Sequence, residues 1–138
     1  MKPSPILLDT CAAVWAAEPD GLSASAQAAL AEADAAGVAV YVSPITAWEL
    51  GMLVSRGRVA LLEPPMRWFS GLLEAGVQLA DLDLSTLVDS SFLPQSRLRD
   101  PADRIITATA RAMGCRIMTR DRPILAYAAA GHVQAIAC

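Results

Sequence analysis

The sequence predicts an α/β fold in three layers (α/β/α), with helices on both faces of a central, mainly parallel, five-stranded sheet. Short apolar runs rich in strand-forming residues alternate with helical stretches along the whole chain, which is typical of a parallel sheet covered on both faces. Cap and turn residues stand at many of the boundaries. The 138 residues suffice for a core that buries roughly two-thirds of the surface of the unfolded chain, so we expect residues 1–138 to form one domain.

In the first half, the strand signals are apolar runs and the helix signals are caps. The first apolar run ends at Asp9, and an Ala-rich helical segment ends at Gly37. Ser43 and Pro44 are typical of an N-cap and the first helical position, and Gly57 follows the end of that helix. We expect, in order, a strand at 5–9, helices at 11–17 and 23–36, a strand at 38–43, and helices at 44–56 and 64–75.

The second half continues the alternation. Asp100 and Pro101 are typical of a helix start, and Gly114 of a helix end. We expect, in order, a strand at 77–82, helices at 84–92 and 101–113, a strand at 115–119, a helix at 122–130 and a last strand at 133–137.

Composition indicates a soluble protein of a reducing cytoplasm. Hydrophobic residues make up 54% of the chain, yet no apolar run reaches the roughly 18 residues that a membrane-spanning helix requires. The first residues lead straight into a strand, without the features of a secretion signal. Cys11, Cys115 and Cys138 are too few and too scattered for a disulfide framework or a CxxC metal site.

Positive charge is concentrated in one segment of a chain whose net charge is −3. Between residues 97 and 122, seven arginines stand against three acids, a local balance of +4. Cations interleaved with acids are what a site that handles a phosphate backbone needs, although a solvated helix face with a loop would look the same. The seven are Arg97, Arg99, Arg104, Arg111, Arg116, Arg120 and Arg122.

Asp9 and Asp121 follow the first and fourth expected strands, at the edge where open α/β sheets bind ligands. The alternative for each is an ordinary turn residue, which is a common role for Asp. Thr10 and Thr119 stand beside them, where a hydroxyl could hold a carboxylate or a metal-bound water.

Glu49 and Asp103 add two carboxylates from expected helices. Glu49 shares a helix face with apolar residues such as Trp48, and its alternative is an edge position that reaches solvent or an arginine. Asp103 could serve the positive end of a helix that Asp100 caps, but it shares a face with Ile106 and so points toward the sheet. Carboxylates gathered in an apolar setting repel one another, so the four acids together predict one cation site.

Other side chains argue against other chemistries. His132 is the only histidine and lies near the C-terminus, which disfavours a His-dependent triad and a zinc site. Oxygen ligands alone favour Mg²⁺ or Mn²⁺. Cys11 has no candidate base and is expected to be a packed thiol. Trp15, Trp48 and Trp68 are expected in the core.

The segments that carry the four acids resemble the successive motifs of PIN-domain ribonucleases, above all the VapC toxins of bacterial toxin–antitoxin pairs. The Asp-Pro-x-Asp-Arg segment and the later Thr-Arg-Asp are the specific part of a resemblance that runs from the first strand to the last. The segments are Leu7 to Thr10, Val42 to Leu50, Arg99 to Ala110 and Met118 to Asp121.

The resemblance implies a PIN-like fold and Mg²⁺- or Mn²⁺-dependent RNA cleavage, in which the ion activates a water that attacks phosphorus. The metal site would be formed by Asp9, Glu49, Asp103 and Asp121. With RNA as the substrate, charge makes Arg99, Arg104 and Arg120 the candidate contacts to its backbone.

The resemblance also implies a homodimer, and a small antitoxin protein whose C-terminal segment lies over the site. Two positions depart from the family pattern, because Cys11 and Leu98 stand where many relatives have His. Neither is a carboxylate ligand, so the departures bear on RNA preference more than on activity.

Other classes of protein fit less well. A haloacid-type phosphatase needs a second Asp where Cys11 stands, and a receiver domain needs a Lys after the last strand, whereas Lys2 is the only lysine. A non-catalytic PIN-like interaction module remains an alternative, which the presence of all four acids opposes and which metal titration would separate from an enzyme.

Overall fold

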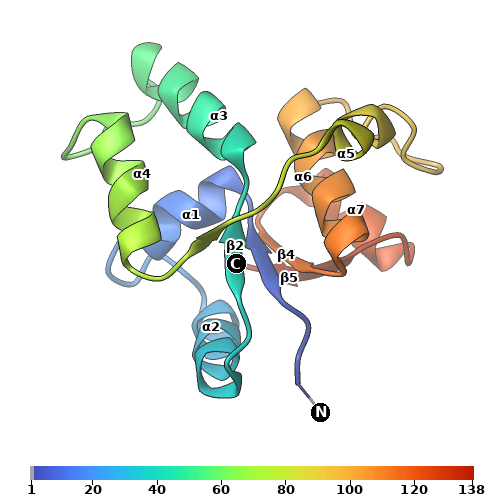
Figure 1. Ribbon diagram of the computed structural model, residues 1–138, viewed down its shortest axis with the longest axis horizontal. Coiled ribbons are helices and arrows are strands. Elements are labelled where there is room, and N and C mark those ends of the chain that lie inside the picture. The colour runs from blue at the N-terminus through green and yellow to red at the C-terminus, as the bar shows by residue number, and fades with distance from the viewer. Residues whose placement is uncertain (1) are drawn as a thin grey trace.

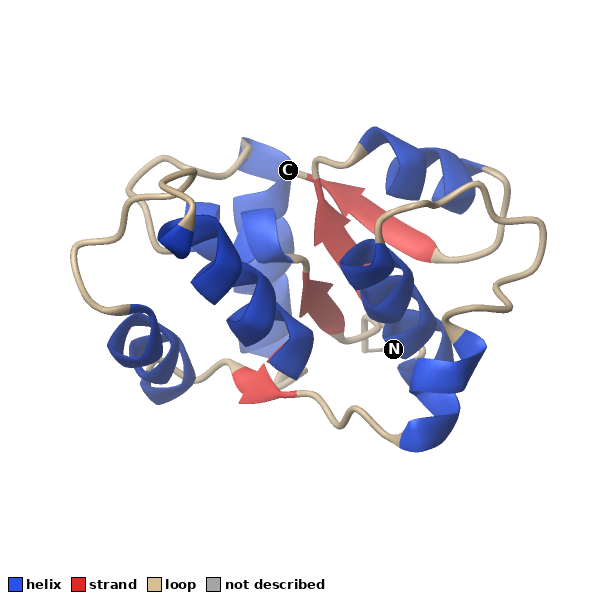
Figure 2. Ribbon diagram, turned by 90° about the horizontal axis from the view of Figure 1, so that it is seen from above, coloured by secondary structure: helices blue, strands red, loops and turns tan. Residues whose placement is uncertain are grey.

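The computed structural model describes residues 2–138 and confirms the three-layer architecture, with helices on both sides of the strands (Figures 1 and 2). All strand pairs are parallel, and the order across the sheet is β3-β2-β1-β4-β5. The strands are β1 (Ile6–Leu8), β2 (Val40–Val42), β3 (Gln78–Leu79), β4 (Arg116–Thr119) and β5 (Gln134–Ala137). All five expected strands are present.

The seven expected helices are also present within residues 2–138. They are α1 (Thr10–Ala16), α2 (Ala24–Ala36), α3 (Pro44–Ser55), α4 (Pro65–Glu74), α5 (Leu84–Asp89), α6 (Pro101–Met113) and α7 (Arg122–Ala129). The largest differences from the expected boundaries are at α5, which ends three residues early, and at β3, expected at 77–82. β3 is short because it is an edge strand whose one neighbour, β2, has only three residues.

Caps account for most of the helix starts. Six of these helices begin after a Ser or Asp whose side chain accepts a hydrogen bond from a backbone N–H of the first turn, which satisfies a group that the helix itself leaves unpaired. The caps are Asp9, Ser23, Ser43, Asp83, Asp100 and Asp121. Gly37 and Gly114 end α2 and α6 in the left-handed region, as the sequence predicts.

The sheet separates two apolar clusters, because successive side chains of a strand point to opposite faces. Ile6, Leu8 and Met118 pack against α1, α2 and α4, whereas Leu7 and Ile117 pack against α6 and α7. The helices of the first cluster present mainly alanines, which allow them to approach the strands closely. These are Ala12, Ala13, Ala26, Ala29 and Ala33. Figure 1 shows the two groups of helices on opposite sides of the strands.

The expectation that all three tryptophans belong to the core is wrong for two of them. Trp15 is 41% exposed and Trp48 is 58% exposed, while Trp68 is partly buried against the first cluster. In α3 the fully buried positions are Thr46 and Leu50, one turn apart. The helix face that contains Trp48 therefore does not face the core.

Candidate functional site

Asp9 and Asp121 lie at the same edge of the sheet, because they follow the neighbouring parallel strands β1 and β4. The Asp9 N–H donates to the carbonyl of Met118, 3.1 Å away, which joins the ends of the two strands. Glu49 reaches this edge from α3 and Asp103 from the first turn of α6, and these two helices pack against each other. The four acids thus come from four separate elements.

Asp9 is the most constrained of the four. It is buried, with 4% of its surface exposed. Oδ1 accepts a hydrogen bond from the Ala12 N–H (2.7 Å), and Oδ2 accepts one from the Thr119 hydroxyl. The same Thr119 hydroxyl accepts from the Asp121 N–H (2.9 Å). Thr119 therefore links the backbone at Asp121 to the carboxylate of Asp9.

Thr10 connects a second pair of elements. Its hydroxyl lies 3.1 Å from the hydroxyl of Thr46, and both side chains are buried. This contact joins the start of α1 to α3 one turn before Glu49. A hydrogen bond from Thr10 also favours the charged form of Glu49 and so opposes the rise in its pKa. Thr10 thus supports the placement of Glu49, whereas Thr119 supports that of Asp9.

Burial raises the pKa of three of the acids. It raises the pKa of Asp103 to about 8, reinforced by the negative charges of Asp100, Asp121, Glu49 and Asp9 in that order. Burial likewise raises the pKa of Asp9 against the opposing hydrogen bonds from Thr119 and Ala12, and Asp121 adds to the rise.

The pKa of Glu49 is also raised, first by burial and then by Asp100 and Asp9. The structure therefore brings Asp9, Glu49, Asp103 and Asp121 close enough to act on one another electrostatically. Holding like charges close together costs more free energy than placing them apart. Such a cluster with raised pKa values is therefore a candidate functional site.

Three helix N-termini meet at this cluster and reduce its repulsion. Asp9 caps α1, Asp121 caps α7 through the Ile124 N–H (2.9 Å), and Asp100 caps α6 through the Asp103 N–H (3.1 Å). The N-terminal end of a helix carries partial positive charge. Asp9 and Asp121 are thus helix caps in addition to belonging to the cluster, a role that their position after a strand did not reveal.

The donor set suits a hard divalent cation, because it consists of carboxylate and hydroxyl oxygens. Within residues 2–138, however, no three His, Cys, Asp or Glu side chains stand close enough together to hold an ion as they are. Asp9 is buried and hydrogen-bonded, whereas Glu49 and Asp103 are partly exposed. The residues therefore fit Mg²⁺ or Mn²⁺ by the chemistry of their oxygen donors.

The arginine-rich segment is mostly occupied with its own fold. Arg104 donates to the carbonyls of Ser90 (2.8 Å) and Leu98 (2.5 Å), which ties α6 to the chain before it. Arg120 lies over the ring of Trp15. Among the candidate RNA contacts, Arg99 is exposed just before the start of α6. Arg97 and Arg122 are exposed, and Arg111 and Arg116 donate to backbone carbonyls.

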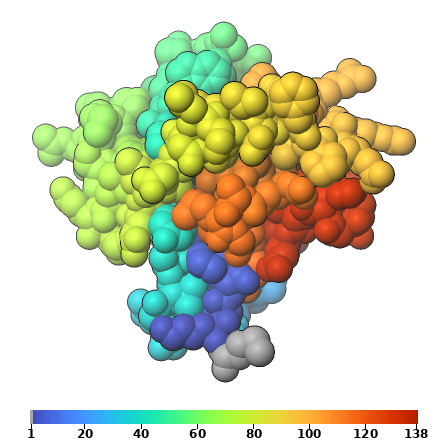
Figure 3. Space-filling view, turned by 45° about the vertical axis from the view of Figure 1, so that its right-hand side comes forward, coloured from blue at the N-terminus to red at the C-terminus, as the bar shows by residue number. Residues whose placement is uncertain are grey.

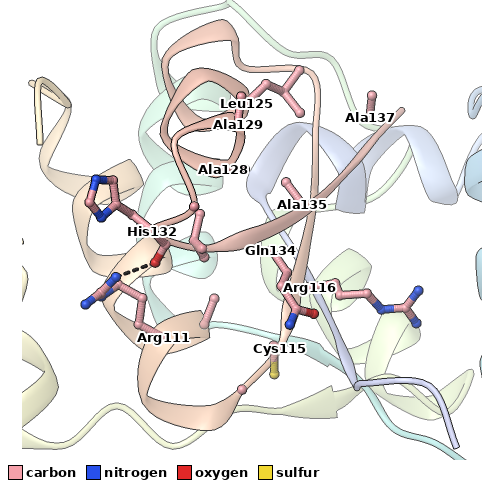
Figure 4. Close-up of a pocket in the computed structure, with 14 residues that line it drawn as sticks. Arg111, Cys115, Arg116, Leu125, Ala128, Ala129, His132, Gln134, Ala135 and Ala137 are labelled. Atoms are coloured by element: carbon pink, nitrogen blue, oxygen red, sulfur yellow. Dashed lines mark hydrogen bonds between the residues drawn. The ribbon is translucent and has the colours of Figure 1, made fainter.

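A wide hollow lies away from the acids. It has a volume of about 1010 Å³ and is formed by the end of α6, by α7 and by β5 (Figure 4). None of the four acids lines it. His132 borders this hollow, and its ring stacks on that of Tyr127 at 4.6 Å between ring centres. The single histidine thus packs outside the acidic cluster.

Sequence reasoning missed two supporting side chains. Thr46 gave no signal, because a threonine in the first turn of a helix is ordinary, and its contact with Thr10 joins residues 36 positions apart. Trp15 gave the wrong signal, because its helical position suggested the core. In both cases the tertiary fold assigns the role.

Comparisons with known proteins agree with this architecture. A family model of the PIN domain matches residues 6–130. The chain is 37% identical over 123 residues to Ribonuclease VapC22 of Mycobacterium tuberculosis, which covers 88% of this chain and 91% of that protein.

Two solved structures share the fold at low sequence identity. The crystal structure of VapBC2 from Rickettsia felis bound to a promoter DNA fragment contains a chain with a TM-score of 0.70 and 16% identity, which covers 96% of this chain and 98% of that one. DNA-bound VapBC from Salmonella typhimurium gives 0.64 and 14%, with 98% of each chain covered. Since the family model spans nearly the whole sequence, the chain belongs to the PIN-domain family.

Proposed function

We propose that the protein is a metal-dependent endoribonuclease that acts as the toxin of a toxin–antitoxin pair. The observation that carries the proposal is the convergence of Asp9, Glu49, Asp103 and Asp121 at the carboxyl edge of the sheet, where burial, reinforced by neighbouring negative charges, raises the pKa values of Asp9, Glu49 and Asp103. The identity to Ribonuclease VapC22 supports ribonuclease activity, and membership of the PIN family supports the use of a metal ion.

The four carboxylates would hold Mg²⁺ or Mn²⁺, with Asp9 as the fixed member and Glu49 and Asp103 as the adjustable ones. When bound, such an ion supplies an activated water and neutralises charge on the phosphate. Thr119 keeps Asp9 in place through its hydroxyl. We propose that Arg99, which is exposed just before α6, contacts the phosphate backbone of RNA, a contact that would position the substrate without reading its sequence.

Proton release accompanies this binding. Because the pKa of Asp103 is about 8, this carboxyl group keeps its proton through much of the neutral range in the metal-free protein. A cation therefore has to displace that proton. Asp103 thereby makes the affinity for the ion depend on pH.

The antitoxin is expected to combine an apolar segment with a basic residue. An open groove of about 640 Å³ runs between the α1–α2 loop, the α3–α4 loop and α4. Leu62 borders it and is fully exposed. Trp48 on α3 and Met66 on α4 are also exposed, although they do not line the groove. We propose that an apolar segment of the antitoxin lies in this groove and that a separate Arg or Lys of the same protein reaches the acids, where it would compete with the metal.

A second copy of the chain is expected on the surface that carries α5. Four apolar side chains are exposed on α5 and at Phe92, three positions after its end. This is an unusual density for a free surface. They are Leu84, Leu87, Val88 and Phe92, of which Leu84 and Phe92 are 81% and 77% exposed. Figure 3 shows this segment, in yellow, spread over the surface. We propose that it forms the homodimer contact.

We place the protein in the cytoplasm, where its RNA substrate and its antitoxin are made. Among residues 2–138, no helix is both long and apolar enough to cross a membrane.

Cleavage of structured RNA by the purified protein tests the activity. Cleavage is expected with Mg²⁺ or Mn²⁺ and none with excess EDTA, while Asp103→Asn should abolish it. Asp83→Asn is the matched control, since Asp83 also caps a helix but is not part of the acidic cluster. A protein that binds Mg²⁺ but cleaves no RNA would support a non-catalytic interaction module, and cleavage that persists in EDTA would rule out the metal mechanism.

A further inference from the structure

Arg120 lies between Thr119 and Asp121, yet its side chain leads to α1 and the loop that follows it. The guanidinium carbon Cζ stands 4.6 Å from the centre of the Trp15 ring, at a distance typical of a cation–π contact. The guanidinium also donates a hydrogen bond to the Gly21 carbonyl. Arg120 therefore connects the end of β4 to the last turn of α1 and to the loop between α1 and α2.

The loop that receives Arg120 is built for close approach. A Cβ atom at Gly21 would stand 2.2 Å from the carbonyl oxygen of Trp15, which leaves room for glycine only. Asp20 adopts a positive φ of 58°, and the Gly21 N–H donates to the Glu18 carbonyl (3.2 Å). The Glu18 N–H in turn donates to the Trp15 carbonyl (3.1 Å). The loop thus folds back on α1 and turns the Gly21 carbonyl to Arg120.

Together with Thr119, this contact fixes α1 at both ends. At its start, the carboxylate of Asp9 accepts from Thr119, and at its end the ring of Trp15 lies under Arg120. Thr119 and Arg120 are consecutive residues of the turn that leads to Asp121. Thr119 and Arg120 therefore tie α1 to the turn that carries Asp121. Asp9 is the residue at which α1 begins.

We propose that Arg120 is a positioning residue, whose contacts with Trp15 and Gly21 set the spacing between Asp9 and Asp121 before metal and RNA bind. This role rests on the proposed ribonuclease function. It differs from the contact to the RNA backbone that charge alone suggests, because the guanidinium is already held by a ring and a carbonyl.

Three variants separate the two roles. Arg120→Lys keeps a positive charge for a phosphate but loses the planar group that covers Trp15 and reaches Gly21. Gly21→Ala removes no charge and displaces the loop. Arg122→Lys is the matched control, an exposed arginine on the other side of Asp121.

The first measurement is amide hydrogen exchange by NMR in metal-free protein. Arg120→Lys and Gly21→Ala should both speed exchange at the 18–21 turn and at Asp121, by about tenfold or more if the lost contacts have their usual strength. Arg122→Lys should leave exchange unchanged. If Gly21→Ala does not fold, as circular dichroism will show, Arg120→Lys decides alone.

The second measurement compares cleavage with RNA affinity. Arg120→Lys and Gly21→Ala should both need more Mg²⁺ for half-maximal cleavage, and both should cleave more slowly at saturating Mg²⁺. Their affinity for RNA, measured in an Asp9→Asn background that does not cleave, should equal that of the background alone.

Two results would overturn the assignment. One is wild-type exchange rates in both Arg120→Lys and Gly21→Ala, and the other is normal cleavage by Arg120→Lys together with lost RNA affinity in a fourth variant, Arg120→Ala, which removes the charge. The latter would make Arg120 a phosphate contact. If the wild type cleaves no RNA with any divalent ion, the proposed function fails. The exchange rates still decide whether the contacts of Arg120 with Trp15 and Gly21 hold the turn in place.

Discussion

The two ends of the strands carry charges of opposite sign. The charged groups at one end are hydrogen-bonded to the backbone, whereas those at the other end stand near charges of the same sign. At the amino end, Arg116 donates twice to the Ser4 carbonyl (2.9 and 3.2 Å) and Arg111 donates to the His132 carbonyl, so both guanidinium groups fasten the chain to itself. At the carboxyl end, Asp9 is buried and Asp103 is half-buried, both stand near other acids, and their pKa values rise. One end uses its charges for stability, whereas the other gathers like charges at a cost in free energy.

Replacing an acid at the carboxyl end should have the largest effect on activity. Asp9→Asn keeps the side-chain shape and a hydrogen-bonding oxygen but removes the charge that a cation needs. We expect cleavage to fall on the order of a thousandfold, as for the loss of a metal's contribution of several kcal/mol. Metal-free stability should stay equal or rise, because the repulsion among the acids decreases.

A single-turnover cleavage assay and a thermal melt in EDTA measure these two effects on the same sample. Asp83→Asn, the cap of α5, should change neither. A large loss of metal-free stability in Asp9→Asn would mean that this carboxylate is primarily structural.

Removing the hydroxyl that supports Asp9 should have the next largest effect. Thr119→Val keeps the shape of the side chain but breaks the hydrogen bonds with the Asp9 carboxylate and the Asp121 N–H. Supporting groups of a metal ligand typically contribute about 10- to 100-fold in affinity or activity, and we expect a loss in that range. Thr119→Ser retains the hydroxyl and should recover most of the activity, as cleavage across a Mg²⁺ titration would show.

The amino end should behave in the opposite way. Arg116→Met removes both hydrogen bonds to Ser4 while keeping much of the apolar stem. The free energy of unfolding should fall by about 1–2 kcal/mol, because hydrogen bonds made by a charged group are lost. Urea denaturation measures this loss. Cleavage should match the wild type, and a decrease in cleavage in proportion to the loss of stability would remove the distinction between the two ends.

The sequence predicted the fold more completely than the site, and particular residues show why. Alternation, caps at Ser43 and Asp100 and the left-handed Gly114 are local signals, and local signals place strands and helices. That Asp9 and Asp121 share one edge also followed, because each comes after a strand of a sheet predicted to be parallel. The tertiary roles of Trp15 and Arg120 could not be predicted in this way. The spacing of Trp15 along its helix is the same whether its ring packs in the core or under a guanidinium group.

The arginine segment shows the same limit. Seven arginines in 26 residues suggested a binding surface, yet Arg104, Arg111, Arg116 and Arg120 donate to backbone carbonyls from other parts of the chain. Which carbonyl lies within reach depends on long-range packing, and composition contains no information about it.

The charge on Asp103 should make metal-free stability depend on pH. Its folded pKa of about 8 lies above the ordinary value of 3.8, so the folded protein holds a proton that the unfolded chain releases. The contribution of Asp103 to stability is therefore highest below about pH 4, decreases as pH rises toward about 8 and then levels off. Because the group is partly solvated, we expect a decrease of only about 1–2 kcal/mol.

Urea denaturation at a series of pH values in EDTA measures this dependence, and Asp103→Asn should flatten it over that range. An equal slope in the wild type and in Asp103→Asn would mean that Asp103 titrates normally and that the acidic end is less strained than the structure indicates.

The smallest effect should distinguish two acids three residues apart. Asp100 caps α6 by accepting from the Asp103 N–H, and Asn is as good a cap, so Asp100→Asn should change stability by no more than a few tenths of a kcal/mol. It should also retain the stabilisation that Mg²⁺ confers, about 2.7 kcal/mol at a hundredfold excess over Kd, whereas Asp103→Asn should lose most of it. Melts with and without Mg²⁺ compare the two variants. If Asp100→Asn abolishes the response while Asp103→Asn keeps it, the ligand and the cap are exchanged, and the acidic end begins one helical turn earlier than proposed.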